Sequence, residues 1–70
     1  MNEIPLHSSV LASLRYDPDQ QQLRLRFRTE ELYVYRMVPA HTVEEFINAP
    51  SHGQYFNSVI RRCFECLRLS

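Results

Sequence analysis

The stretch Leu23-Arg24-Leu25-Arg26-Phe27-Arg28 alternates apolar and charged side chains without a break. Successive side chains of a β-strand point to opposite faces of a sheet, so this alternation predicts a half-buried strand. The three apolar residues are expected to face a core and the arginines to face away from it. A sheet with one apolar face needs a second layer to cover that face.

Two further strands are predicted on either side of this one. Residues 10–16 place Val10, Ala12, Leu14 and Tyr16 on one face of a strand, and residues 32–38 are rich in β-branched and aromatic residues. The turn residues Asp17-Pro18-Asp19 and the short link Thr29-Glu30-Glu31 make both connections hairpins. We expect Tyr16 to lie near Leu23 and Leu25 near Tyr33. The inward side chains are then Val10, Ala12, Leu14 and Tyr16 in the first strand, and Tyr33, Tyr35 and Met37 in the third.

After Pro39, the spacing of the apolar residues changes from that of a strand to that of a helix. Pro39 has no N–H to donate to a sheet, so it ends the last predicted strand. Capping boxes starting at Thr42 and Ser51 predict two helices. The second helix is expected to bury one stripe, made of Phe56, Val59, Ile60, Cys63, Phe64 and Leu67. The predicted fold is α+β (βββαα): a three-stranded antiparallel sheet, in the order 1-2-3, covered on one face by two C-terminal helices. Residues 1–7 are expected to form a flexible arm and residues 8–70 a single domain.

Composition argues against several classes of protein. The chain has 70 residues, 44% of them hydrophobic and 23% charged, which is ordinary for a small globular domain. No apolar run approaches the roughly 20 residues of a membrane span, and no leader sequence is apparent, so we expect a cytoplasmic protein with no membrane association. Cys63 and Cys66 are expected to be free thiols that pack in the core or at its edge. The histidines lack metal-ligand spacing and no nucleophile has a base beside it, so we expect no metal, cofactor or catalytic site.

Strand alternation gathers positive charge on the sheet face away from the helices. The formal net charge is zero, and the eight basic residues are all arginines. The outward arginines are Arg15, Arg24, Arg26, Arg28 and Arg36. One interpretation is a solvated surface; the other is an anion-binding face for RNA or another polyanion. An alternative function is protein–protein contact or self-association through the same face or an open strand edge. The sequence leaves the oligomeric state open.

The segment 51–61 contains a second group of candidate residues. Ser51 and Gly53 fit either a simple helix cap or an anion site formed by free amides. Asn57 and Arg61 share a helix face, where they either brace the helix against Ser8 or Ser9 or bind a ligand. Arg61 is therefore a further candidate for anion contact.

An ordered series of residues from Ser8 to about Phe64 resembles the KTSC domain. The residues that carry the resemblance are Ser8, Ser9, Tyr16, Asp17, Tyr33, Tyr35, Val38, Pro39, Ala49, Ser51, Gly53, Tyr55, Phe56, Asn57, Ile60 and Arg61. The chain departs from the family pattern at Thr29-Glu30-Glu31, where the family usually has a glycine, and at Phe64, where it prefers tyrosine.

The KTSC domain occurs at the C-terminus of some lysyl-tRNA synthetases and as small stand-alone bacterial proteins. The family has no established activity, so the resemblance adds no catalytic role to the small non-catalytic binding module, without a cofactor, that the residues favour. The resemblance does imply RNA as the suggested ligand, by analogy with the fused enzyme.

Overall fold

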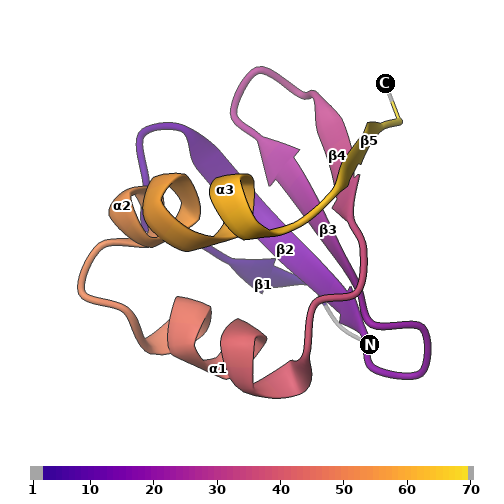
Figure 1. Ribbon diagram of the computed structural model, residues 1–70. Coiled ribbons are helices and arrows are strands. Elements are labelled where there is room, and N and C mark those ends of the chain that lie inside the picture. The colour runs from indigo at the N-terminus through magenta and orange to yellow at the C-terminus, as the bar shows by residue number, and fades with distance from the viewer. Residues whose placement is uncertain (1–2, 70) are drawn as a thin grey trace.

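The computed structural model describes residues 3–69, which form a five-stranded antiparallel sheet in the order β1-β2-β3-β4-β5 with helices packed on one face (Figure 1). The strands are β1 (Ile4–Pro5), β2 (Leu11–Asp17), β3 (Gln22–Phe27), β4 (Leu32–Tyr35) and β5 (Cys66–Arg68). The helices are α1 (Ala40–Asn48), α2 (His52–Tyr55), the π-helix η1 (Phe56–Ile60) and α3 (Arg61–Cys63). Because α2, η1 and α3 follow one another without a gap, they form one continuous rod across the sheet.

The central strand β3 has the predicted register with both neighbours. Tyr16 lies opposite Leu23 across β2 and β3, and Leu25 lies opposite Tyr33 across β3 and β4. Leu23 and Leu25 are fully buried. Alternation in one strand therefore predicted the middle of the sheet correctly.

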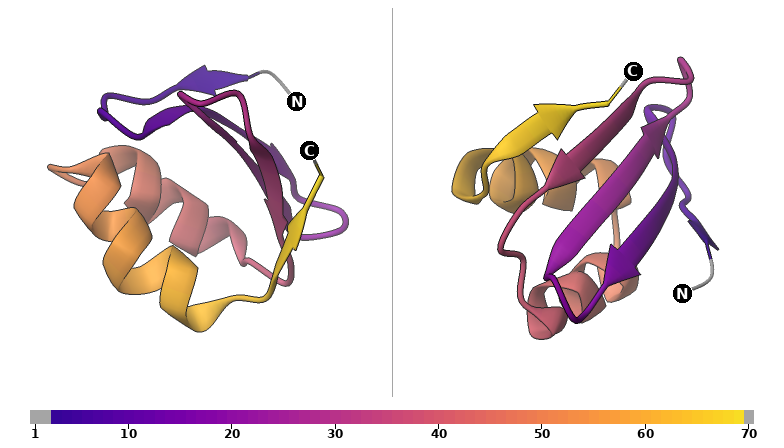
Figure 2. Two further views of the ribbon diagram at one scale, coloured as in Figure 1. Left: turned by 90° about the horizontal axis from the view of Figure 1, so that it is seen from above. Right: turned by 90° about the vertical axis from the view of Figure 1, so that its right-hand side faces the viewer.

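The helices cover the apolar face of the curved sheet (Figure 2). Phe46 of α1 and Ile60 of η1 are fully buried in the same core cluster as Leu14, Leu23 and Leu25. Burial of such a side chain contributes roughly 1.5–3 kcal/mol, so this layer holds the sheet and the helices together.

The prediction of a three-stranded sheet is wrong, because one more strand lies at each edge. β1 comes from the segment that was expected to be an arm. It is held by the buried Leu6, whose N–H donates to the Ala12 carbonyl at 3.0 Å, and by a 3.0 Å hydrogen bond from the His7 N–H to His52 Nδ1. A proline at position 5 is compatible with an edge strand, where one side of the backbone needs no partner.

β5 lies in the segment that was expected to continue the last helix. Helical geometry ends at Cys63, and Phe64 is extended with φ −127° and ψ 146°. Cys63 and Cys66 are both exposed, so the expectation that they pack in the core is also wrong. β5 then pairs with β4, with Leu67 opposite Val34.

A β-bulge in β2 changes which side chains face the core. Leu11 pairs with Phe27 and Ser13 with Arg26, so Ala12 is an extra residue in the pairing. The bulge places Leu11 in the core, fully buried, and leaves Val10 51% exposed instead of inward as predicted. Met37 was also expected to point inward, but it is 76% exposed. Its φ of 58° turns the chain sharply just after β4.

One of the two predicted helix caps is confirmed. The Ser51 hydroxyl oxygen accepts a hydrogen bond from the Gln54 N–H at 3.3 Å. Thr42 does not cap α1, because the helix already begins at Ala40 with Pro39 as its N-cap residue. The carbonyl of Pro39 accepts the Thr42 N–H, so Thr42 lies inside the first turn and is buried.

Candidate functional site

The sheet face away from the helices carries exposed arginines on β2 and β3, and we call Arg15, Arg24 and Arg26 the arginine face. Arg15 and Arg24 lie directly opposite each other across the two strands, which follows from the predicted pairing of Tyr16 with Leu23. With Ser13 and Glu3, the three arginines line an open hollow of about 230 Å³.

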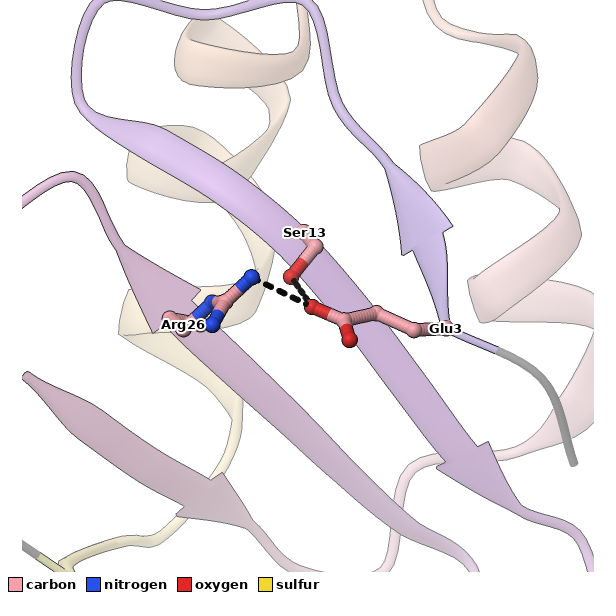
Figure 3. Close-up of polar contacts among 3 residues, drawn as sticks. All are labelled: Glu3, Ser13 and Arg26. Carbon is pink, nitrogen blue, oxygen red and sulfur yellow. Dashed lines mark hydrogen bonds and ion pairs between the residues drawn. The ribbon is translucent and has the colours of Figure 1, made fainter. Parts of the chain in front are cut away.

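Glu3 partly neutralises this face. Its carboxylate forms an ion pair with Arg26 at 3.0 Å and accepts a hydrogen bond from the Ser13 hydroxyl (Figure 3). The hydrogen bond from Ser13 is the main reason that the pKa of Glu3 lies below its ordinary value of 4.5. Desolvation opposes this shift, and the charges of Arg26 and Arg15 add to it. Arg26 is therefore already occupied by a carboxylate.

Two other predicted anion-binding arginines are also engaged within the protein. Arg28 Nε donates to the Ser8 carbonyl at 2.8 Å, which ties the β3–β4 hairpin to the chain leading into β2. Arg36 pairs with Glu65 at 3.2 Å. Within the described residues 3–69, the ion pairs include neither Arg15 nor Arg24. Of the five arginines in the predicted patch, Arg15 and Arg24 are thus the two that form neither an ion pair nor a side-chain hydrogen bond within residues 3–69.

Arg61 lies in a different place, in a cavity between the rod and the sheet. This cavity, which we call the aromatic cleft, has a volume of about 330 Å³. Its lining residues are Val10, Leu11, Phe27, Glu31, Tyr33, Tyr35, Gly53, Phe56, Asn57 and Arg61. Six of these residues, Tyr33, Tyr35, Gly53, Phe56, Asn57 and Arg61, also carry the family resemblance. The sequence alone did not group them, because they come from β4 and the rod and meet only in the folded chain.

Edge-to-face ring contacts form the wall of the aromatic cleft. The ring centroids of Phe27 and Tyr33 are 5.2 Å apart, and those of Phe27 and Phe56 are 5.5 Å apart. Tyr35 also contacts Phe56, at 5.9 Å. Tyr35 and Phe56 are buried, whereas Phe27 and Tyr33 are half-buried and lie at the accessible part of the wall.

Electrostatic interactions place Arg61 close to this wall. Burial is the main reason that the pKa of Tyr35 is raised, and the Cys66 thiol and Tyr33 raise it further. The positive charge of Arg61 opposes this shift. Arg61 is thus within electrostatic reach of the phenol of Tyr35.

Several of the resemblance residues have evident structural roles. The Ser8 hydroxyl oxygen accepts hydrogen bonds from the Val10 and Leu11 amides at 3.0 and 3.2 Å and shapes the entry into β2. The Tyr16 hydroxyl donates to the Val38 carbonyl at 2.5 Å, which fixes the chain before α1. Ile60 is fully buried, and Ser9 is exposed.

Two negative findings hold for residues 3–69, the part of the chain that the structure describes. No cluster of three or more histidine, cysteine or acidic side chains could hold a metal ion there. In that same part of the chain, no helix has the length and apolar character needed to cross a bilayer.

Comparison with known proteins agrees with the architecture. The sequence model of the KTSC domain matches residues 7–64. The crystal structure of a KTSC domain protein from Yersinia pestis superposes with a TM-score of 0.92 at 35% sequence identity, covering 99% of this chain and 97% of that one.

Sequence relatives include both small proteins and parts of enzymes. An uncharacterized protein from Stutzerimonas stutzeri is 43% identical over 61 residues, which are 87% of this chain and 86% of that protein. A lysine–tRNA ligase from Nostoc sp. is 42% identical over 62 residues, which are 89% of this chain but only 11% of the ligase. The chain is thus similar to whole small proteins and to a short part of a much longer enzyme. By the extent of these matches, the chain belongs to the KTSC domain family.

Proposed function

We propose that the domain is a non-catalytic binding module for single-stranded RNA, with Arg15 and Arg24 as its phosphate contacts. The observation that carries this proposal is that two exposed arginines occupy directly opposed positions of β2 and β3 and form no ion pair within residues 3–69. Like charges in opposed positions of a sheet are unfavourable, and a bound polyanion would relieve the repulsion. Arginine also presents planar paired donors that suit phosphate oxygens.

The relatives support the choice of RNA over other polyanions. A domain of this family lies within a lysine–tRNA ligase, whose name identifies an RNA substrate for that enzyme. The net charge of the present chain is zero, so bulk attraction to nucleic acid is absent and affinity must come from the local patch. We therefore expect weak binding with a small electrostatic component.

A salt-dependent titration tests this proposal. Fluorescence anisotropy of a labelled oligouridylate is measured at about 50 and about 200 mM salt. Two phosphate contacts to a single strand predict that the logarithm of the association constant falls with the logarithm of salt concentration with a slope of about −1.4. No binding, or binding that does not respond to salt, would contradict the proposal.

A second candidate function is self-association along β5, which is one of the two outer strands of the described sheet. Leu32, Leu67 and Leu69 are exposed side by side there, since the Leu69 N–H donates to the Leu32 carbonyl at 2.7 Å and Leu67 lies opposite Val34. An exposed apolar edge can pair with a second copy. Sedimentation analysis of the wild-type chain and of Leu67→Lys tests this function: a dimer that survives high salt and dissociates in the variant would support it.

A further inference from the structure

We propose that the aromatic cleft binds one nucleotide, with the base against the rings of Tyr33 and Phe27 and the phosphate on Arg61. The choice of a nucleotide rests on the proposed RNA-binding function. The case for a binding site rests on the geometry of the cleft.

The backbone of the rod turns Arg61 toward the cleft. The Arg61 N–H donates to the carbonyl of Phe56, five residues earlier, and this bond defines the π-helix η1. In a regular α-helix, two residues five positions apart lie about 140° apart around the axis. A π turn holds more residues than an α turn, so Arg61 lies closer to Phe56 around the axis than it would in a regular α-helix. Single π turns are uncommon and occur often at functional sites.

The polar side chains of the cleft are available to a ligand. Asn57 and Arg61 are exposed, and within residues 3–69 neither side chain has a hydrogen bond or ion pair of the kind that engages Arg26, Arg28 and Arg36. Bracing against Ser8 was one of the two roles that the sequence left open for Asn57 and Arg61, but within residues 3–69 the side-chain hydrogen bonds of Ser8 are with the Val10 and Leu11 amides. Packing therefore does not explain why these two residues lie beside a cavity.

The chemistry of the lining selects a flat ligand that carries an anion. A cavity of about 330 Å³ is at the lower end of ligand-site volumes, which suits a single nucleotide unit. Half-buried aromatic rings offer faces on which a base can stack, and a carboxamide can donate to and accept from a base edge. Glu31 lines the cleft too, but it pairs with Arg68 at 3.0 Å, so the positive charge of Arg61 is not neutralised by it.

Uridine monophosphate is the probe, added to the ¹⁵N-labelled chain and followed by amide chemical shifts. We expect the largest shifts at Gly53, Asn57 and Arg61, and weaker binding both of uridine, which lacks the phosphate, and of ribose 5-phosphate, which lacks the base. Arg61→Gln should weaken binding about tenfold, the effect of losing a charged hydrogen bond. Arg62→Gln, which removes the same charge from the neighbouring exposed residue outside the cleft, should leave affinity unchanged.

Several outcomes would overturn the inference. One is that the amide chemical shifts change only at the arginine face; another is that Arg61→Gln and Arg62→Gln affect nucleotide affinity equally. Binding of ribose 5-phosphate as strong as that of the nucleotide would also contradict the inference. So would stronger binding of a peptide that ends in an aromatic residue and a free carboxylate. If Arg61→Gln disturbs folding, Asn57→Ala at an exposed position should still weaken nucleotide binding.

The same variants separate this inference from the proposed function. If the oligouridylate binds wild type and Arg61→Gln equally well, the cleft inference fails and the arginine face remains. If the oligouridylate does not bind but the mononucleotide does, the proposed RNA function fails and the cleft is a site for a free nucleotide.

Discussion

Arg15 on β2 and Arg24 on β3 lie directly opposite each other at the centre of the exposed sheet face. Their neighbour Arg26 is paired with Glu3, so within residues 3–69 Arg15 and Arg24 are the two arginines of this face that form no ion pair. Opposed like charges on a sheet lower stability by a few tenths of a kcal/mol. Replacing either Arg15 or Arg24 should therefore change stability and RNA affinity in opposite directions.

Replacing Arg24 with threonine tests this relationship. Threonine is a good strand residue, so Arg24→Thr should leave stability unchanged or raise it by a few tenths of a kcal/mol. RNA affinity should fall by about 1 kcal/mol, and the salt slope should become shallower by about 0.7. Thermal melting and the anisotropy titration measure the two effects. Arg62→Gln is the control, because it removes one positive charge from an exposed residue of α3 that lies outside the arginine face.

Two results would contradict the assignment of Arg24 as an exposed residue that contacts phosphate. A variant that binds RNA like the wild type with the same slope would show that Arg24 contacts no phosphate. A strongly destabilised variant would show that Arg24 has a structural role.

The contact of Glu3 with Ser13 and Arg26 predicts an acid-dependent loss of stability. The pKa of Glu3 is lowered in the folded state, so its stabilising contribution is complete above the ordinary value of 4.5 and is lost as pH falls through the folded value. Glu3→Gln should therefore melt below the wild type at about pH 7, and the difference should shrink at about pH 3.

Melting temperatures of the two proteins across this range measure the effect. Glu44→Gln, at an exposed position of α1, is the control, and its difference in melting temperature from the wild type should not depend on pH. If the difference in melting temperature between the wild type and Glu3→Gln stays constant with pH, the carboxylate charge of Glu3 does not stabilise β1.

The β3–β4 hairpin contains a strained residue where the family usually has a glycine nearby. Glu30 has a φ of 72°, in the left-handed region that disfavours any residue with a Cβ. Glu30→Gly should raise the free energy of unfolding by about 0.5 kcal/mol, since relief of strain exceeds the added entropy of the unfolded chain. Urea denaturation measures this. Glu30→Ala removes the same charge but keeps the Cβ, so an equal gain in that variant would show that charge, not strain, is responsible.

Sequence reasoning succeeded where one periodicity continued and failed where it was interrupted. The pairing of Leu25 with Tyr33 follows directly from alternation. The inward position of Leu11 does not, because a bulge at Ala12 shifts the alternation by one residue. The helical pattern predicted for residues 63–67 was a coincidence of spacing. Phe64 does pack against the core, but from an extended backbone, and Leu67 belongs to a strand.

The arginine face and the aromatic cleft also differed in how far they could be predicted from the sequence. Arg15 and Arg24 could be assigned to one face because both lie in predicted strands and the register followed from the pattern. The aromatic cleft could not be predicted, because it needs the rod to cross the sheet and a π turn to reorient Arg61. A π turn has no composition signal comparable to a cap or a turn, so the position of Arg61 in the same cleft as Phe56 could not be predicted.

Gly53 allows stability to be separated from nucleotide binding. It lies in α2 and lines the cleft, and an added Cβ would meet only the Ser8 hydroxyl oxygen, at an ordinary contact distance of 3.4 Å. Because alanine is favoured over glycine in a helix by up to about 1 kcal/mol, Gly53→Ala should unfold at a higher urea concentration. The same methyl group occupies space beside the cleft and should weaken binding of uridine monophosphate. Gln54→Ala, at the next and exposed position, should change neither quantity appreciably. If Gly53→Ala gains stability and binds the nucleotide as well as the wild type does, the nucleotide does not approach α2. That result would contradict a binding site in the part of the cleft that Gly53 lines.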